Sequence, residues 1–128
     1  MAEFRIQRKT LLTFDEALTR VPPALQAQGF GVLTQIDVKE TLYKKLGVDF
    51  RQYRIFGACN PKFAHRALST ELEIGVMLPC NVVVYEGDDG KAVLLAIDPM
   101  ATIASTRPGL AEIAGEVRAG LLRALESV

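Results

Sequence analysis

Hydrophobic positions along this chain follow two periods, one typical of strands and one typical of amphipathic helices. Apolar alternation and short apolar runs predict five strands. These strands fall at residues 4–6, 30–36, 53–59, 82–85 and 92–97. Apolar residues three or four positions apart predict four helices between and after the strands. The helices are expected to begin near residues 14, 38, 61 and 108.

Capping residues mark where two of these helices begin and end. Thr13 stands three residues before Glu16, which is the spacing of a capping box. Asp37 stands in the same relation to Glu40, and Gly47 suits the left-handed position just after a helix. The segment between Asp37 and Gly47 is therefore the most self-consistent helix of the chain.

A proline pair interrupts the first helical pattern at Pro22 and Pro23. A proline in a helix interior lacks an N–H donor, and its ring clashes with the preceding turn. We therefore predict a kink or a restart at this pair, with Gly29 ending the second piece.

The loop at residues 86–91, Glu-Gly-Asp-Asp-Gly-Lys, is typical of a hairpin between the last two strands. A hairpin makes one strand pair antiparallel, which disfavours a purely parallel, doubly wound sheet. The prediction is an α+β fold with about five strands in a mainly antiparallel or mixed sheet and helices packed on one face. The 128 residues show no linker or repeat, so a single domain spanning 1–128 is expected.

Charge and composition narrow the range of partners. Basic and acidic residues balance at 15 each, whereas nucleic-acid binders usually carry a basic excess. No apolar run approaches the roughly 20 residues that span a bilayer, and the N-terminus lacks the pattern of a signal peptide. A chain with 2 cysteines suits a reducing compartment. We therefore expect a cytoplasmic protein that binds neither nucleic acid nor membrane.

The residue types best suited to catalysis or ligand binding gather around a Cys-Asn pair that occurs twice. Cys59-Asn60 ends one predicted strand, and Cys80-Asn81 precedes another. His65, the single histidine, lies in the helix that Asn60 is expected to cap. Because a helix N-terminus favours anions, Cys59 stands where a thiolate is stabilised and where a small ligand or anion can bind. These five residues are the predicted ligand-binding set, and Cys59 and His65 are the candidates for catalysis.

Each of these residues also has a purely structural explanation. Asn60 is sufficiently explained as a helix cap, and cysteines often pack as small hydrophobic residues. A zinc site of Cys59, His65 and Cys80 needs a fourth ligand that the spacing does not supply, so no metal is predicted. A disulfide needs the two sulfurs within bonding distance, which the sequence does not show. No phosphate-binding glycine loop or hydrolase motif is present, and no particular cofactor is indicated.

A resemblance to a known family rests on five segments of the chain. They are residues 29–39, 57–61, 64–68, 78–85 and the Asp98-Pro99 pair. In these segments the chain resembles a family of bacterial and archaeal proteins, the domain-of-unknown-function family 302. The resemblance covers nearly the whole chain, and the two Cys-Asn pairs are its most specific part. It implies a small α+β domain that forms a homodimer, and it assigns no catalytic residue.

The sequence thus predicts a small dimeric binding or accessory domain, with a small-ligand or anion pocket near the two Cys-Asn pairs. A first alternative is a thiol-dependent enzyme, or a redox or metal protein, that uses Cys59, His65 and Cys80. A second alternative is a purely structural dimer module. Whether the chain is an enzyme stays open at this point, because no base is fixed next to either thiol.

Overall fold

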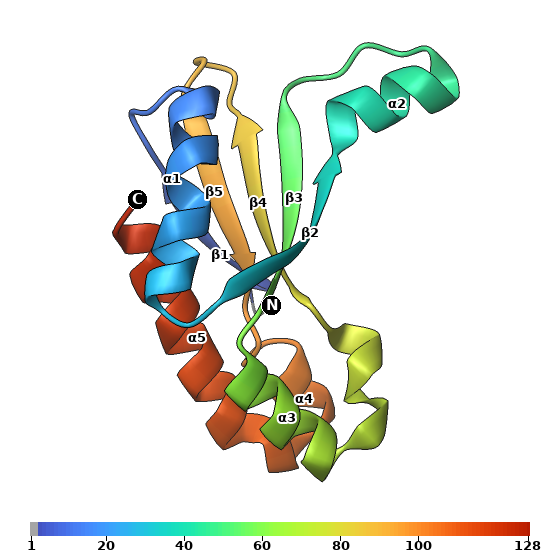
Figure 1. Cartoon of the computed structure of the whole chain (residues 1–128), viewed down its shortest axis with the longest axis vertical. Helices are drawn as coiled ribbons and strands as arrows, with labels where there is room; N and C mark the ends of the chain where they lie inside the picture. The colour runs from blue at the N-terminus through green and yellow to red at the C-terminus, as the bar shows by residue number, and fades with distance from the viewer. Residues whose placement is uncertain (1–2) are drawn as a thin grey trace.

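Five strands form one antiparallel sheet in the order β1-β5-β4-β3-β2 (Figure 1). They are β1 (Arg5–Lys9), β2 (Gly31–Asp37), β3 (Tyr53–Cys59), β4 (Cys80–Glu86) and β5 (Ala92–Ile97). This computed structural model describes residues 3–128. It confirms the predicted α+β fold, and every strand pair in the sheet is antiparallel.

Five α-helices and two short 3-10 helices accompany the sheet in the described residues. They are α1 (Phe14–Ala27), α2 (Val38–Leu46), α3 (Pro61–Thr70), η1 (Leu72–Met77), α4 (Ile103–Thr106), η2 (Pro108–Leu110) and α5 (Ala111–Glu126). The helices α1 and α5 lie against one face of the sheet (Figure 1). At one end of the sheet, α3, η1, α4, η2 and the start of α5 gather into a group that we call the foot lobe. None of the helices in residues 3–128 is long and apolar enough to cross a bilayer.

The main hydrophobic core lies between the sheet and the layer formed by α1 and α5. Side chains alternate along a strand, so every second residue faces this layer, on what we call the covered face. One row of paired core residues crosses four strands and consists of Ile6, Ala96, Val82 and Phe56. The helix residues buried against this face include Ala17, Val21, Leu25, Leu121, Ala124 and Leu125. The alternation of the strands and the apolar stripes of two helices therefore form one core.

The helix α1 continues through Pro22 and Pro23, so a restart, one of the two outcomes predicted at this pair, does not occur. Both prolines lie away from the core, where water can bond to the carbonyl groups that they leave free. On the opposite side of the helix, Val21 and Leu25 are fully buried. This packing outweighs the local preference against proline. Gly29 follows the helix with a positive φ of 85°, in line with the expected helix end.

The predicted helix caps are confirmed. The Thr13 side chain accepts a hydrogen bond from the Glu16 backbone, and the Glu16 carboxylate accepts one from the Thr13 N–H. The Asp37 carboxylate accepts a bond of 3.0 Å from the Glu40 N–H. Gly47 ends α2 in the left-handed conformation, with φ 67°. Local sequence signals therefore placed these helix ends correctly.

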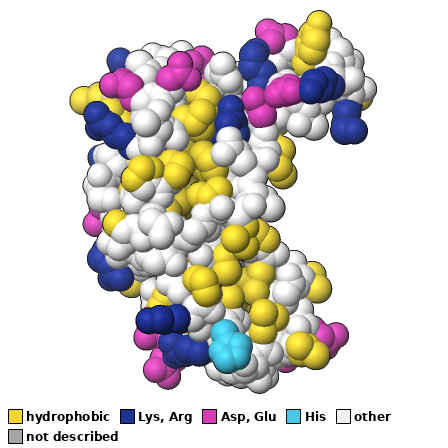
Figure 2. Space-filling view, in the orientation of Figure 1, with side chains coloured by type: hydrophobic (Ala, Val, Ile, Leu, Met, Phe, Trp, Pro, Cys, Tyr) yellow, Lys and Arg dark blue, Asp and Glu magenta, His cyan; other side chains and the backbone are white. Residues whose placement is uncertain are grey.

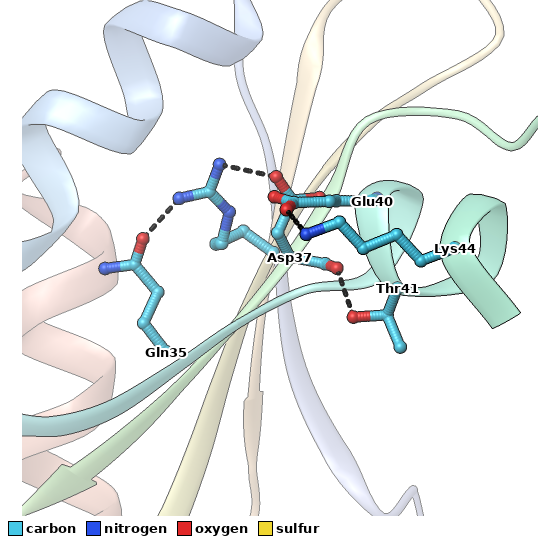
Figure 3. Close-up of polar contacts among 6 residues, drawn as sticks. Gln35, Asp37, Glu40, Thr41 and Lys44 are labelled. Carbon is cyan, nitrogen blue, oxygen red and sulfur yellow. Dashed lines mark hydrogen bonds and ion pairs between the residues drawn. The ribbon is translucent and has the colours of Figure 1, made fainter.

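The helix α2 and the loop after it, residues 38–50, form an arm that projects from the sheet (Figure 1). None of the nine α2 residues is buried. Polar contacts fix the base of this α2 arm (Figure 3). The Arg54 guanidinium donates to the side chains of Gln35 and Asp37, and the Thr41 hydroxyl donates to the Asp37 carbonyl. These contacts attach the arm to β2 and β3 without covering its apolar side chains.

Several element boundaries differ from the prediction, and two short helices were not predicted. The strand β1 continues to Lys9, and Arg8 donates hydrogen bonds to the carbonyls of Leu125 and Val128 at the end of α5. Pro108 opens the short η2, and the last helix begins three residues later at Ala111. The short helices η1 and α4 were not predicted, because segments of four to six residues show no clear apolar period.

Candidate functional site

An apolar cavity of about 370 Å³ lies between the foot lobe and the adjacent end of the sheet. Its walls come from the ends of β2, β3 and β4, from α3 and η1, and from the start of α5. Its lining side chains include Phe30, Phe63, Leu68, Leu78, Ile103 and Val117. Figure 2 shows hydrophobic side chains gathered on the foot lobe, beside a hollow that separates this lobe from the α2 arm.

Two strand ends bring both cysteines to this cavity. β3 ends at Cys59, β4 begins at Cys80, and both side chains line the cavity. Cys80 pairs with Ala58 in the antiparallel register, so it belongs to the strand and not to a turn before it. Pairing thus extends β4 two residues beyond its predicted start, and it turns Cys80 toward the core.

Gly57 allows the chain to close over the end of β3. A Cβ atom at this position would lie 2.8 Å from Cγ of Pro79, and it would collide with the Thr34 side chain. The peptide bond between Leu78 and Pro79 is cis. Both Thr34 and Pro79 line the cavity. Because Gly57 has no side chain, Thr34 and Pro79 can pack close to it and form this part of the cavity wall.

The helix α3 supplies another wall and begins after Asn60. The Asn60 side chain accepts a hydrogen bond of 3.5 Å from the Phe63 N–H, and a proline occupies the first helical position. The predicted cap is thus confirmed. The helix then presents Ala64, Ala67 and Leu68 to the cavity, at the spacing of one helix face.

The two thiols at the cavity are both free, but their surroundings differ. Burial raises the pKa of the Cys80 thiol to about 11, and repulsion between thiolates at Cys80 and nearby Cys59 adds to the rise. Cys80 is therefore a neutral thiol near pH 7 and packs as a small hydrophobic side chain. Cys59 is half-buried, so it is the more accessible of the two thiols.

The other two predicted site residues lie outside the cavity. His65 is exposed on α3 and is not part of the cavity lining, whereas Cys59 is. Asn81 is exposed on β4, where it pairs with Gly57, and its side chain points to the face of the sheet opposite Cys80. His65 therefore does not share the cavity with the two thiols. The structure brings together Cys59, Asn60 and Cys80 from the predicted set of five.

The cavity lining is poor in polar groups, and no charged side chain of residues 3–128 takes part in it. Its polar side chains are Thr34, Cys59, Asn60 and Cys80. Nor does the described part of the chain hold a cluster of three or more His, Cys, Asp or Glu side chains suited to a metal ion. Charges are costly to bury without a partner. The lining therefore favours an apolar ligand over an anion or a metal ion.

Most of the cavity wall was not among the predicted site residues. Ala64, Ala67 and Leu68 share one face of a helix, and this apolar spacing is a signal that could have located the wall. Leu78 and Ile103 carried no such signal, because they lie in or beside short segments without a clear period.

The sheet, the helix layer and the cavity define a small α+β domain built on five antiparallel strands. The chain belongs to the family described as domain of unknown function DUF302, whose sequence model matches residues 6–128. It is similar to a solved structure, an uncharacterized conserved protein DUF302 from Bacillus stearothermophilus, with 34% sequence identity. That similarity covers 98% of each chain, with a TM-score of 0.89. Among curated proteins, no similar sequence was found.

Proposed function

We propose that this chain is a dimeric binding domain whose cavity takes a compact, mainly apolar small molecule. The observation that carries the proposal is the cavity of about 370 Å³ with an almost entirely apolar lining. Sites for small molecules typically measure about 300 to 1,000 Å³ and combine apolar walls with a few polar groups. The cavity meets both conditions at the small end of this range.

The polar groups in the lining indicate how such a ligand is oriented. Thr34, Cys59 and Asn60 offer a hydroxyl, a thiol and an amide at the end of the sheet. The opposite wall, from the foot lobe, is formed by aliphatic side chains such as Leu68 and Ile103. A molecule with an apolar body and a single neutral polar group suits this arrangement, because each of its ends meets matching chemistry.

The anion pocket and the thiol-dependent enzyme have less support. The cations near the start of α3 do not line the cavity, and one of them, Arg66, pairs with Glu116 at 2.8 Å. For thiol chemistry, His65 does not line the cavity beside Cys59, and burial raises the pKa of Cys80 to about 11. A neutral ligand needs neither a free cation nor a reactive thiol. Binding of such a ligand is therefore the hypothesis with the fewest requirements.

Titration with 1-aminoanthracene, a small neutral fluorescent probe, tests the cavity directly. We expect binding in the micromolar range, as is usual for an apolar molecule of this size. Ala64→Phe fills the cavity with a ring and is expected to weaken binding at least about ten-fold. The matched control is Ala27→Phe, at an exposed position at the end of α1.

Circular dichroism of both variants checks that the fold is retained, and Ala67→Leu is a milder filling variant should Ala64→Phe not fold. Equal probe affinity in the filled and control variants would reject the cavity as the binding site. Absence of probe binding to the wild type would instead favour the structural dimer module, in which the cavity has no ligand.

A further inference from the structure

The face of the sheet opposite α1 and α5, which we call the uncovered face, is apolar at its centre. One row of paired residues crosses four strands and consists of Ile36, Ile55, Val83 and Leu95. None of the four belongs to a buried core cluster in the described residues. A sheet face that meets water usually carries polar side chains. This apolar row is therefore not packed against any core cluster of the described residues.

Aromatic side chains connect the uncovered face to the α2 arm. Tyr53 and Tyr85 are paired across β3 and β4, and their rings stack with centroids 5.6 Å apart. The ring of Phe50, at the end of the arm, lies 6.3 Å from that of Tyr53. The end of the arm at Phe50 thus adjoins the aromatic pair on the sheet face.

The α2 arm exposes large hydrophobic side chains along its length. Tyr43 is 67% exposed and Leu46 is 69% exposed, and Val48 and Phe50 continue the exposed surface. A helix of nine residues is too short to be stable without tertiary packing. Because α2 buries none of its own residues in this chain, its apolar side chains are expected to pack on a partner.

The uncovered face of the sheet is too small to form a stable dimer by itself. Four strands about 4.8 Å apart and about 20 Å long present roughly 400 Å². A stable dimer buries about 800 Å² on each partner, or about twice that area. The arm projects beyond the sheet and supplies the additional surface (Figure 1).

Charge distinguishes among possible partners. The arm together with its capping residue Asp37, residues 37–50, contains three acidic and three basic residues, so the charges of this segment balance. Lys39 pairs with Asp49 at 2.7 Å, and Lys44 pairs with Glu40. A surface without net charge does not repel a copy of itself, and it offers no attraction to a strongly charged partner. A two-fold contact, in which each copy presents the same patch, fits this balance.

We propose that the uncovered sheet face and the α2 arm together form the interface between two copies of this chain. The inference rests on the dimeric state contained in the proposed function, and it assigns the surface that makes the dimer. The core of the contact is the row through Ile55 and Val83, and Leu46 and Tyr43 of the arm extend it. Polar side chains on β1, such as Gln7 and Lys9, border the apolar rows as the rim of an interface does.

Sedimentation velocity over a range of concentrations tests this surface. The wild type is expected to sediment with twice the chain mass of 14.0 kDa. Leu46→Lys places a charge in the contact and should raise the dimer dissociation constant at least about ten-fold. The matched control is Leu11→Lys in the loop before α1, where an 87% exposed leucine lies outside the proposed surface. The control should leave the dissociation constant unchanged.

Because Leu46 is exposed, the variant is expected to keep its fold, which circular dichroism checks. A wild type that sediments as one chain at every concentration would overturn the proposal, as would a Leu46→Lys dimer of unchanged affinity. Binding of 1-aminoanthracene is measured on the same samples. A wild type that stays monomeric but binds the probe rejects the dimer and keeps the cavity. A Leu46→Lys dimer of unchanged affinity rejects the interface alone, and a dimer that binds no probe rejects the cavity alone.

Discussion

The two faces of the sheet are both apolar, but only one of them is covered within the chain. Leu94 on the covered face is fully buried, whereas its neighbour Leu95 faces the other way and is half-buried. The same contrast holds for Val84 and Val83 on β4. In a sheet that served a monomer, the second residue of each pair would be polar. The difference suggests that one face serves folding and the other serves association.

The helices repeat this contrast. Both α1 and α2 begin with a side-chain cap, but α1 buries four residues against the sheet and α2 buries none. Good capping therefore does not reveal whether a helix belongs to the core. What separates the two helices is the surface that their apolar side chains meet, and for α2 we propose that this surface belongs to a second copy of the chain.

The largest expected effect comes from one substitution made on each face. Leu94→Ala should lower the free energy of unfolding by about 3 kcal/mol, because it leaves a cavity in the core. Leu95→Ala should cost about 1 kcal/mol, since its side chain is only half-buried. Urea denaturation in the Leu46→Lys background, which is expected to be monomeric, measures both without the contribution of the dimer. Equal losses would remove the distinction between the faces.

The pH dependence of the free energy of unfolding gives a second test of burial, through the Cys80 thiol. The unfolded Cys80 thiol ionises near pH 9.0, whereas burial raises the pKa of the folded thiol to about 11. Between these values the folded state binds more protons, so the free energy of unfolding falls as pH rises. The full expected loss is about 2 to 3 kcal/mol; most of it has developed by pH 11, and the rest follows as pH rises through the folded pKa.

Thermal or urea unfolding of the wild type and Cys80→Ala from pH 8 to 11 isolates this effect, because other groups titrate equally in both proteins. The curve of the variant should be flatter than that of the wild type by the stated amount. The substitution Cys59→Ala should reduce this slope only slightly, because repulsion from Cys59 is the smaller of the two causes of the raised pKa of Cys80. Parallel curves for the wild type and Cys80→Ala would contradict the burial argument.

Much of the fold could be predicted because its signals are local. Asp37 and Gly47 bound α2 correctly, and the loop at 86–91 identified the antiparallel hairpin. The helix does not restart at Pro22 and Pro23, because burial of one helix face overrides the local preference. That burial depends on contacts with the sheet and α5, which no local pattern contains.

The candidate site was less predictable than the fold. Cys59, Asn60 and Cys80 lie at the cavity, but His65 and Asn81 do not. A strand or helix presents neighbouring residues on different sides, so closeness in sequence did not mean closeness at the site. The cavity itself joins segments from all along the chain, and its existence follows only from how the foot lobe packs on the sheet.

The most direct test of the account exploits the two faces at adjacent positions of β4. Val83 lies at the centre of the uncovered face, while Val82 and Val84 are fully buried in the core. Sedimentation velocity of Val83→Lys measures whether that face joins two chains. We expect a folded single chain of 14.0 kDa at concentrations where the wild type sediments as two chains. A folded dimer with the affinity of the wild type would contradict it.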